Sequence, residues 1–343
     1  MLHINIQQMP QVNNKYSVTI IGLGNIGLLY DLEKSKSSKE FLTHTRSAFY
    51  HENFEIKFLI DSDPDKLLLA KNKYGNKINY LTNISEEYSP TDIIVLASLP
   101  SVNSFFLNKF KEDRLVKFFL IEKPFLNKSE KLSNYKDIIH KTYVNYFRKS
   151  LPFYKNLKID IDNFKFGNIV GVNIFYSKGL SNNGSHLIDL MNFLFDSSYN
   201  LESINIINYK NDYSIKDESV TFSVEYTYKT KSFSTIFHAL DESKFSLAEV
   251  DLIFEKNRLR MFDFGGKIEV YEVQSDKVFS GYKNLIPIEI IDSDIDSYGI
   301  HTYNKIYNML EENELNYSTL EDESNIYTLK KHINNKLKEF KNE

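Results

Sequence analysis

A glycine-rich stretch near the start of the chain constrains the fold most. The sequence at 22–27 reads G-x-G-x-x-G, directly after the apolar run 17–21 and before a helical pattern. In that context the glycines give a tight turn, close approach of the backbone to a pyrophosphate, and close helix–strand packing. The N-terminus of the following helix would attract the phosphates. The motif favours dinucleotide binding over a merely structural turn. The residues that we expect at the cofactor are Gly22, Gly24, Asn25, Ile26 and Gly27.

The rest of the first half alternates between strand and helix patterns. Asp63, Pro64 and Gly75 bracket a helix, as cap, first-turn proline and terminating glycine. Continuous apolar strands that alternate with helices predict a doubly wound parallel sheet covered on both faces, an α/β Rossmann domain. The expected strands are 17–21, 54–60, 93–97, 117–121 and 142–144, and the other expected helices are 102–111 and 129–140.

From about residue 165 the pattern changes to one of alternating polar and apolar residues. Such alternation is typical of half-buried antiparallel strands. We therefore expect a second, α+β domain with an open, mostly antiparallel sheet, and divide the chain into domains 1–150 and 151–343. The expected strands are 220–228, 233–237, 250–254, 258–262 and 267–273, and helical spacing marks 185–195, a helix lined by 300–310 and another lined by 326–340.

Composition excludes several classes of protein. The 343 residues carry a net charge of -4, so nucleic acid is not an expected partner. The chain has no cysteine, which excludes disulfides, thiolate metal sites and cysteine nucleophiles. It has no apolar stretch of membrane-spanning length, and residues 1–16 lack a secretory pattern. We expect a cytoplasmic protein with no membrane partner.

An acidic residue ends the second predicted strand. Asp61, with Ser62 beside it, is placed to bind the adenosine ribose hydroxyls and to repel the extra phosphate of NADP, so NAD is the preferred cofactor. Asp61 follows Gly22 by 39 positions, where about 20 are usual, and we ascribe the excess to a polar insertion around 31–39. The alternative is a capping or surface carboxylate.

Two further segments lie where ligands bind in such a sheet, beyond the carboxyl ends of strands. Glu122-Lys123-Pro124 follows the strand 117–121, and Lys123 can reach cofactor and substrate there. A lysine in this position is by itself more often a solvated loop residue. Ser98 and Pro100 follow the preceding strand and are expected to approach the cofactor.

The chain resembles the Gfo/Idh/MocA oxidoreductases. The resemblance rests on GLGNIG at 22–27, Asp61, EKP at 122–124 and NNGSHLIDL at 182–190, in this order. It implies a Rossmann domain, a second domain whose sheet forms a homo-oligomer, dimer or tetramer, and oxidation or reduction of a sugar, polyol or sugar nucleotide with NAD(P). It also implies that Glu122 lies at the cofactor and that Lys123 contacts both nicotinamide and substrate. The resemblance of the motif at 182–190 to that of such family members implies an amino- or deoxy-sugar, or its nucleotide-linked form, in surface polysaccharide synthesis.

The second-domain motif supplies the remaining candidate residues. Asn182, His186 and Asp189 share one helical face. The resemblance assigns His186 as the acid/base and Asp189 as the following acid, and places Asn182 and Asn183 at the substrate. Asn182 departs from the family pattern, which has aspartate there, so a proton relay through this position is lost. Taken alone, His186 is a helix-start histidine with a satisfied hydrogen bond.

Weaker candidates surround these. Tyr146 and Arg148 lie after the last Rossmann strand, where substrate-side residues are often found in the family, or simply enter a helix. Lys178 precedes the histidine motif and is either an anion contact or solvated. The other histidines form no i,i+4 pair, so no metal site is expected.

These residues predict an NAD-dependent dehydrogenase or reductase acting on a CH-OH group of a small sugar-like molecule. His186 would take the hydroxyl proton, Lys123 would stabilise the alkoxide, and Asp189 would orient His186 or a substrate hydroxyl. Two alternatives stay open: a non-catalytic NAD(P)-binding sensor or regulator, and an NAD-assisted glycosidase that returns the hydride.

Overall fold

The structure is a computed structural model that describes residues 15–84, 87–126, 130–196, 198–214 and 217–342. Residues 1–14, which carry most of the expectation about a secretory segment, lie outside the described residues, as does Ser129 at the start of one predicted helix. Among the described residues, no helix is long and apolar enough to cross a membrane.

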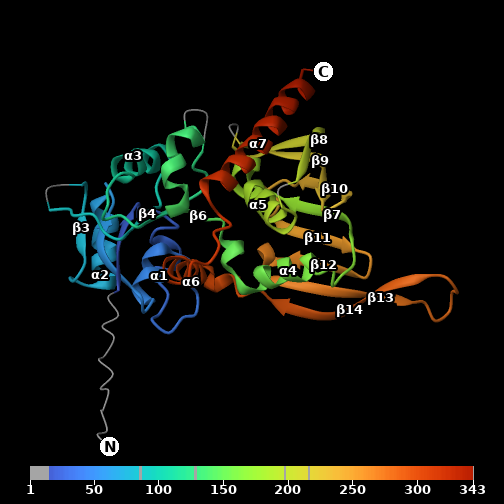
Figure 1. Ribbon diagram of the computed structural model, residues 1–343, viewed down its shortest axis with the longest axis horizontal. Coiled ribbons are helices and arrows are strands. Elements are labelled where there is room, and N and C mark those ends of the chain that lie inside the picture. Colours follow the sequence, from blue (N-terminus) through green and yellow to red (C-terminus); the bar gives the residue numbers. More distant parts are fainter. Residues whose placement is uncertain (1–14, 85–86, 127–129, 197, 215–216, 343) are drawn as a thin grey trace, which may run out of the picture.

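The first domain is a six-stranded parallel sheet with helices on both faces (Figure 1). Its strand order is β3-β2-β1-β4-β5-β6. The interior of the sheet is apolar because Ile20, Ile94 and Leu120 are fully buried. This confirms the predicted doubly wound parallel sheet of a Rossmann domain. The strand order reverses between β1 and β4, the kind of position at which such sheets bind ligands. The strands are β1 Tyr16–Ile21, β2 Phe54–Ile60, β3 Asn79–Leu81, β4 Ile93–Leu96, β5 Phe118–Ile121 and β6 Thr142–Val144.

The helices of this domain begin and end largely where local signals place them. In α2 (Pro64–Tyr74) the Asp63 side chain accepts from the Asp65 N–H at 3.0 Å, and Gly75 ends the helix at φ +84°. Two other helices are α3 (Pro100–Phe110) and the 3₁₀ helix η2 (Leu132–Lys141). The segment η2 corresponds to the helix expected over 129–140 and has the 3₁₀ form.

The helix expected directly after Gly27 is interrupted, and here the prediction was wrong. A single turn after Gly24 leads into the 3₁₀ helix η1 (Leu29–Asp31), and α1 begins only at His44 and ends at Tyr50. The N–H groups of His44 and Thr45 donate to the carbonyls of Ile26 and Gly27, at 3.0 and 3.1 Å. Because a helical N–H bonds to the carbonyl four residues back, His44 takes the place that residue 30 would have in an uninterrupted helix. Residues 30–43 therefore form an excursion of 14 residues.

This excursion accounts for the unusual spacing between Gly22 and Asp61. It is longer than the insertion expected at 31–39 and includes apolar residues, such as Phe41 and Leu42, that lie against the chain near 296–299. Phe41 exchanges backbone hydrogen bonds with Asp296 and Gly299, both of which lie in the second half of the sequence. The excursion therefore connects the glycine loop with a distant segment that reaches the site.

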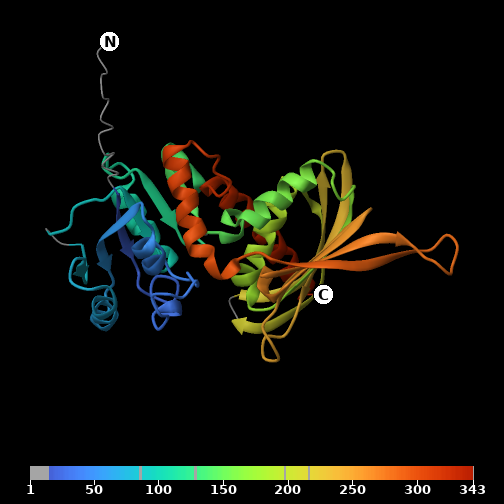
Figure 2. The ribbon, with the colours of Figure 1, turned by 90° about the horizontal axis from the view of Figure 1, so that it is seen from below.

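The second domain is an eight-stranded sheet in the order β14-β13-β12-β11-β7-β10-β9-β8. All neighbouring strands are antiparallel except β7 and β10, which confirms the predicted mostly antiparallel sheet. The far end of the β13–β14 hairpin projects beyond the rest of the second domain, on the side opposite the first domain (Figure 2). The strands are β7 Ile169–Tyr176, β8 Tyr199–Ser214, β9 Asp217–Tyr228, β10 Lys231–Ala239, β11 Ala248–Phe254, β12 Asn257–Phe262, β13 Lys267–Ser275 and β14 Lys283–Asp292.

Helices cover one face of this sheet and connect it with the first domain. The buried face of α5 (Ser185–Leu194) and the C-terminal α7 (Leu320–Phe340) pack in one apolar core with β9 and β10. The helix α6 (Tyr298–Glu311) instead returns to the first domain, where Tyr303 and Ile306 are buried beside Val18 and Phe54. The remaining helical segments are η3 Phe147–Ser150, α4 Pro152–Asp162, the π-helical turn η4 Gly179–Gly184, and the 3₁₀ turns η5 Asp263–Gly265 and η6 Ile295–Ser297.

Candidate active site

The glycine loop is built for close approach from one side. Gly22 has φ +98°, and a Cβ there would lie 2.7 Å from the Ala97 carbonyl oxygen. A Cβ on Gly27 would lie 2.0 Å from the carbonyl oxygen of Gly22. By contrast, a Cβ on Gly24 would meet nothing within 4 Å, so the backbone at Gly24 faces open space. The loop thus fits a dinucleotide: two glycines allow tight packing, and the third leaves room for a pyrophosphate.

Asp61 ties the end of β2 to this loop. Its Oδ2 accepts from the Leu23 N–H at 2.6 Å and its Oδ1 from the Asp63 N–H at 2.9 Å. The ammonium of Lys66, which the sequence analysis did not single out, lies 3.7 Å from Oδ1. Asp61 is therefore a buttress of the glycine loop in addition to its predicted role at the ribose, and the exposed Ser62 lies next to it.

Ser98 lies at the end of β4, beside Gly22. Its N–H donates to Asn103 Oδ1 and its carbonyl accepts from Asn103 Nδ2, both at 3.0 Å. Asn103 lies on α3, whose first residue is Pro100, and gives no sequence signal of this role. The Ser98 backbone is thereby fixed at the same edge of the sheet as the glycine loop.

A single cavity of about 520 Å³ joins the glycine loop to the second domain. It brings together several of the residues predicted for the cofactor and substrate site, from elements far apart in the sequence. Because the cavity includes the residues after β5 and those at the start of α5, it is the candidate active site. Its lining residues are Asn25, Ile26, Tyr30, Glu122, Lys123, Asn145, Phe147, Lys178, Asn182, Asn183, His186, Tyr213, Phe264 and Tyr298.

Lys123 reaches across from the first domain to the second. Its Nζ donates to the Asn182 backbone carbonyl at 2.9 Å and lies 3.3 Å from Asn182 Oδ1. Burial lowers the pKa of Lys123 to about 8, and the negative charge of the Glu122 carboxylate opposes this lowering. Asn182 can only accept from the ammonium and carries no charge to stabilise it, so the amide leaves Lys123 closer to neutrality than an aspartate would.

The Glu122 carboxylate has two polar partners from other parts of the chain. Its Oε1 lies 2.9 Å from His44 Nε2 and accepts from Asn145 Nδ2 at 2.6 Å. His44 is the first residue of α1, after the excursion. Neither His44 nor Asn145 was predicted for the site, because their nearness to Glu122 depends on tertiary packing.

His186 lies in an apolar, electropositive setting. Its ring centre is 5.5 Å from that of Tyr146 and 5.3 Å from that of Phe147. Burial, followed by the positive charges of Lys123 and Arg148, lowers the pKa of His186 well below its usual range. The imidazole is thus neutral near pH 7, the form in which it can accept a proton.

The turn that presents Asn182 is held by Asp217, on β9. The Asp217 carboxylate accepts from the N–H groups of Ser181 and Asn182, at 2.7 and 3.0 Å. A Cβ on Gly179, which has φ +82°, would lie 2.3 Å from Asp217 Oδ2. Asp217 is a supporting residue that the sequence analysis missed, since no spacing connects it with the histidine motif.

Asp189 is placed differently from the other candidates. It is fully buried, and its Oδ1 lies 2.6 Å from the ammonium of Lys149. Burial raises the pKa of Asp189, and the Lys149 charge opposes the shift. Asp189 lines a separate cavity of about 240 Å³ with Asn192 and Tyr317, and is not among the residues that line the candidate active site.

Tyr146 and Arg148 were predicted to contact the substrate, but neither is among the residues that line the cavity. The Tyr146 hydroxyl donates to Glu323 Oε2 on α7 at 2.6 Å. The Arg148 guanidinium donates to the Phe264 carbonyl at 2.5 Å. Lys178 does line the cavity, and its Nζ lies 2.9 Å from Glu242 Oε1.

Aromatic side chains supply much of the cavity wall, and the sequence analysis missed them. Tyr298, which was not predicted for the site, packs on Phe147, with ring centres 4.6 Å apart, and its hydroxyl donates to the Leu42 carbonyl in the excursion. Aromatic residues are frequent in this chain, with 23 tyrosines and 26 phenylalanines, so composition could not distinguish these few. The aromatic members of the wall are Tyr30, Phe147, Tyr213, Phe264 and Tyr298.

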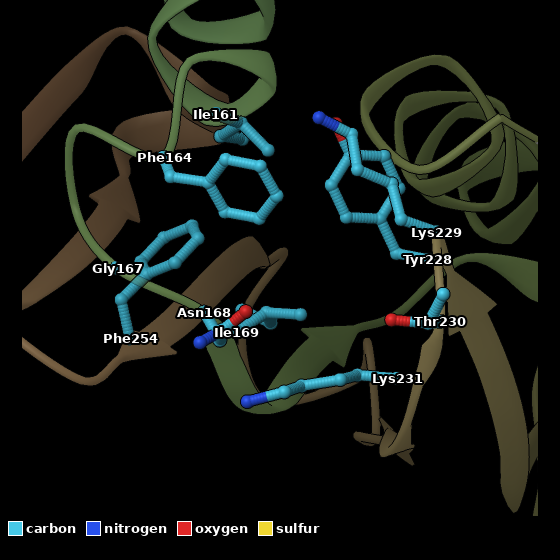
Figure 3. A pocket seen from close by; sticks show the side chains of 10 residues that line it. All are labelled: Ile161, Phe164, Gly167, Asn168, Ile169, Tyr228, Lys229, Thr230, Lys231 and Phe254. Atoms are coloured by element: carbon cyan, nitrogen blue, oxygen red, sulfur yellow. The ribbon is translucent and has the colours of Figure 1, made fainter.

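The other features of the described residues do not compete with this site. No group of three or more histidine, aspartate or glutamate residues among them is arranged to hold a metal ion. A cavity of about 50 Å³ near the end of α4, lined by Phe164, Tyr228 and Lys229 among others, contains none of the predicted site residues (Figure 3).

Comparison with known proteins supports the fold. No family model matches the sequence, and no curated protein matches it. Among solved structures, an oxidoreductase from Agrobacterium radiobacter in complex with NAD+, L-tartaric acid and magnesium is 12% identical, with a TM-score of 0.64, over 92% of this chain and 94% of that chain. The dehydrogenase MviM from Clostridium difficile is 18% identical, with a TM-score of 0.63, over 93% and 99%.

A third neighbour is a super-repressor mutant of Gal80p from Saccharomyces cerevisiae, 16% identical, with a TM-score of 0.68, over 93% of this chain and 96% of that chain. At these identities the likeness shows the fold, which is the one that the sequence resemblance implied.

Proposed function

We propose that this chain is an NAD-dependent oxidoreductase that acts on a secondary alcohol or ketone of a sugar-like substrate. The observation that carries the proposal is the single cavity in which the glycine loop, Lys123 and His186 meet. The oxidoreductase from Agrobacterium radiobacter, whose structure contains NAD+ and L-tartaric acid, supports a nicotinamide cofactor and a small hydroxylated substrate. NADP stays a less favoured alternative because of Asp61.

The residues of the cavity divide the chemistry between them. Bound NAD would supply the acceptor for the hydride that leaves the alcohol carbon. Neutral His186 takes the hydroxyl proton at one of its ring nitrogens, which is worth about 10²–10⁴-fold in rate. Charged Lys123 donates to the same oxygen and stabilises the developing alkoxide. Asp189, paired with Lys149, would act only by positioning α5 and therefore His186.

Removal of either group tests this division. We expect Lys123→Ala and His186→Ala to lose most turnover of the best substrate in a panel of sugars, cyclitols and sugar nucleotides. Both variants should bind NADH in calorimetry as the unchanged protein does. Full turnover in either variant would contradict its assigned role, and an unchanged protein that takes up neither NADH nor NADPH would contradict the whole proposal.

The second candidate function is that of a nucleotide-binding regulator. Asn182 in place of the family aspartate and the likeness to Gal80p favour it. A single-turnover measurement of nicotinamide absorbance with the same panel separates the two: a regulator binds NADH without any change in its redox state.

The assembly is also part of this proposal. We propose a homo-oligomer that pairs the outer face of the eight-stranded sheet, where Arg258–Asp251 and Arg260–Glu249 ion pairs lie among half-buried apolar residues. Light scattering on a sizing column would report a dimer or tetramer, and a monomer at micromolar concentration would contradict it. The cytoplasmic location stays a prediction from the sequence.

A further inference from the structure

The turn between β12 and β13 has an unusual backbone at the edge of the active-site cavity. Asp263, Phe264 and Gly265 have φ angles of +52°, +55° and +90°. Glycine adopts such angles freely and aspartate tolerates them, but they are unfavourable for a phenylalanine. The structure nevertheless places a large aromatic residue at the centre of the turn, and strained residues of this kind concentrate at functional sites.

Buried polar side chains donate hydrogen bonds to the backbone carbonyls of this turn. Arg148, on η3, donates to the Phe264 carbonyl at 2.5 Å, and Tyr154, on α4, donates to the Gly265 carbonyl at 2.8 Å. Ser293 Oγ donates to the same Gly265 carbonyl at 2.7 Å. Arg148, Tyr154 and Ser293 are each at most 5% exposed. Such fixed donors determine the backbone conformation that the sequence of the turn does not favour.

The packing beneath the turn is equally tight. A Cβ on Gly265 would lie 2.4 Å from the Tyr154 hydroxyl and 3.2 Å from Arg148 Nε. The turn therefore cannot settle deeper without displacing these side chains. Phe264 itself remains 42% exposed and lines the cavity that contains Lys123 and His186. The strain thus serves to hold an aromatic ring at the cavity and not in the core.

The chemistry of the cavity indicates what this ring meets. Lys123, Asn182, Asn183 and Lys178 supply polar contacts, whereas Phe264 is one of several aromatic residues in the wall. A pyranose or cyclitol ring has hydroxyl groups around its edge and a non-polar face of C–H groups. That combination matches a cavity with polar groups and an aromatic wall.

We propose that Phe264 is a specificity-determining residue that packs on the C–H face of a ring-shaped polyol, and that Arg148 and Tyr154 are positioning residues that hold it there. This inference rests on the proposed function. It also gives Arg148 an indirect role at the substrate, in place of the direct contact predicted from the sequence.

The kinetic test compares ring and open-chain substrates. The probes are myo-inositol and glucose as rings and sorbitol as the open chain, with NAD+ as oxidant. Phe264→Ala should raise KM for the better ring about tenfold and change kcat little, because stacking is lost while Lys123 and His186 stay. KM for sorbitol and the NADH dissociation constant should change less than twofold.

Three further variants control this result. Phe264→Tyr keeps an aromatic side chain and should keep the preference for ring-shaped substrates. Arg148→Met should reproduce part of the increase in KM for those substrates. Phe279→Ala, an exposed phenylalanine in the turn between β13 and β14, should change nothing. An unchanged ring KM in Phe264→Ala, or equal losses for ring, open chain and NADH, would overturn the proposal.

The backbone strain has its own signature. A glycine usually makes a protein less stable than an alanine at the same position. At φ +55° we expect the opposite, so the Phe264→Gly variant should melt at a higher temperature than the Phe264→Ala variant. A melting temperature for the glycine variant at or below that of the alanine variant would contradict the role of strain.

A fluorescence reading separates this inference from the proposed function. The chain has no tryptophan, so Phe264→Trp introduces a single reporter at the cavity, and Phe279→Trp places one on the extended hairpin. Energy transfer to bound NADH should be strong only from position 264. If the unchanged protein oxidises none of the panel, the proposed function and the ring substrate both fail, whereas equal transfer from both positions would remove Phe264 from the cofactor cavity.

Discussion

Lys123 carries a pKa of about 8, and this value has a direct consequence for activity. The ammonium stabilises an alkoxide only while it is protonated, so kcat/KM for alcohol oxidation should fall as pH rises through about 8. His186 has a pKa well below its usual range, so no acidic limb should appear between pH 6.5 and 8. A pH profile of kcat/KM measures the expected alkaline limb and tests the absence of an acidic one.

Lys123→Arg provides the control for this assignment. Arginine stays charged at all accessible pH values, so the alkaline limb should disappear even if the rate falls because of altered geometry. An alkaline limb that persists at the same pH in Lys123→Arg would assign the titration to another group. A flat profile in the unchanged protein would show that Lys123 stays charged throughout.

Asp61 and Asp63 permit a second test at the level of single residues. Asp61 joins the glycine loop to β2, whereas Asp63 caps α2. Asp61→Ala should weaken NADH binding about tenfold, because charge-assisted hydrogen bonds worth about 1.5 kcal/mol are lost. The variant should also prefer NADH over NADPH less strongly than the unchanged protein does. Asp63→Ala should lower the melting temperature but leave the cofactor preference unchanged. Calorimetric titrations of both variants decide, and an unchanged preference in Asp61→Ala would reject it as selector.

At the scale of elements, the excursion over residues 30–43 contains one buried carboxylate, that of Asp31. Asp31 Oδ2 accepts from the N–H groups of Leu42 and Thr43 at 2.7 and 2.9 Å, and Asp31 Oδ1 accepts from Thr43 Oγ1 at 2.6 Å. Thr43 in turn is the N-cap of α1. Asp31 therefore fixes the point where the interrupted helix resumes, and with it His44 beside Glu122.

We expect Asp31→Ala to lower the free energy of unfolding by about 3 kcal/mol, because the buried N–H of Thr43 and the part-buried N–H of Leu42 lose their acceptor. Glu33→Ala, two residues away and exposed, is the matched control and should change stability by less than about 0.5 kcal/mol. Denaturant unfolding of the two variants measures the difference. If both variants unfold alike, the carboxylate does not hold the excursion.

The elements also show what local sequence can predict. The bounds of β2 and α2 follow from signals within the segments themselves: a mostly apolar run at 54–60, and the cap, proline and glycine around 64–74. The splice of α1 onto the glycine loop could not be predicted, because it depends on hydrogen bonds between residues 18 positions apart. Likewise, Lys123 and His186 were identified from motifs, whereas Asp217, His44 and Phe264 reach the site only through tertiary packing.

At the scale of the whole molecule, the second half of the chain completes the first domain. The helix α6 covers the parallel sheet, and Phe41 of the excursion bonds to the segment that leads into it. The two sheets therefore lie in separate parts of the sequence, 16–144 and 169–292, whereas the apolar core around the first sheet includes residues of α6. Since Tyr298 of α6 also lines the cavity, the packing of this helix and the shape of the active site depend on each other.

Tyr303 offers a measure of this dependence. Its ring is fully buried, 5.2 Å from that of Phe54, and its hydroxyl has no hydrogen-bond partner among the described residues. Tyr303→Ala should cost about 3–5 kcal/mol of unfolding free energy and weaken NADH binding. Tyr303→Phe removes only the unpaired hydroxyl and should leave stability equal or higher. Denaturant unfolding with NADH titration tests both, and a Tyr303→Ala variant with unchanged cofactor affinity would show that the first domain holds its ligand without α6.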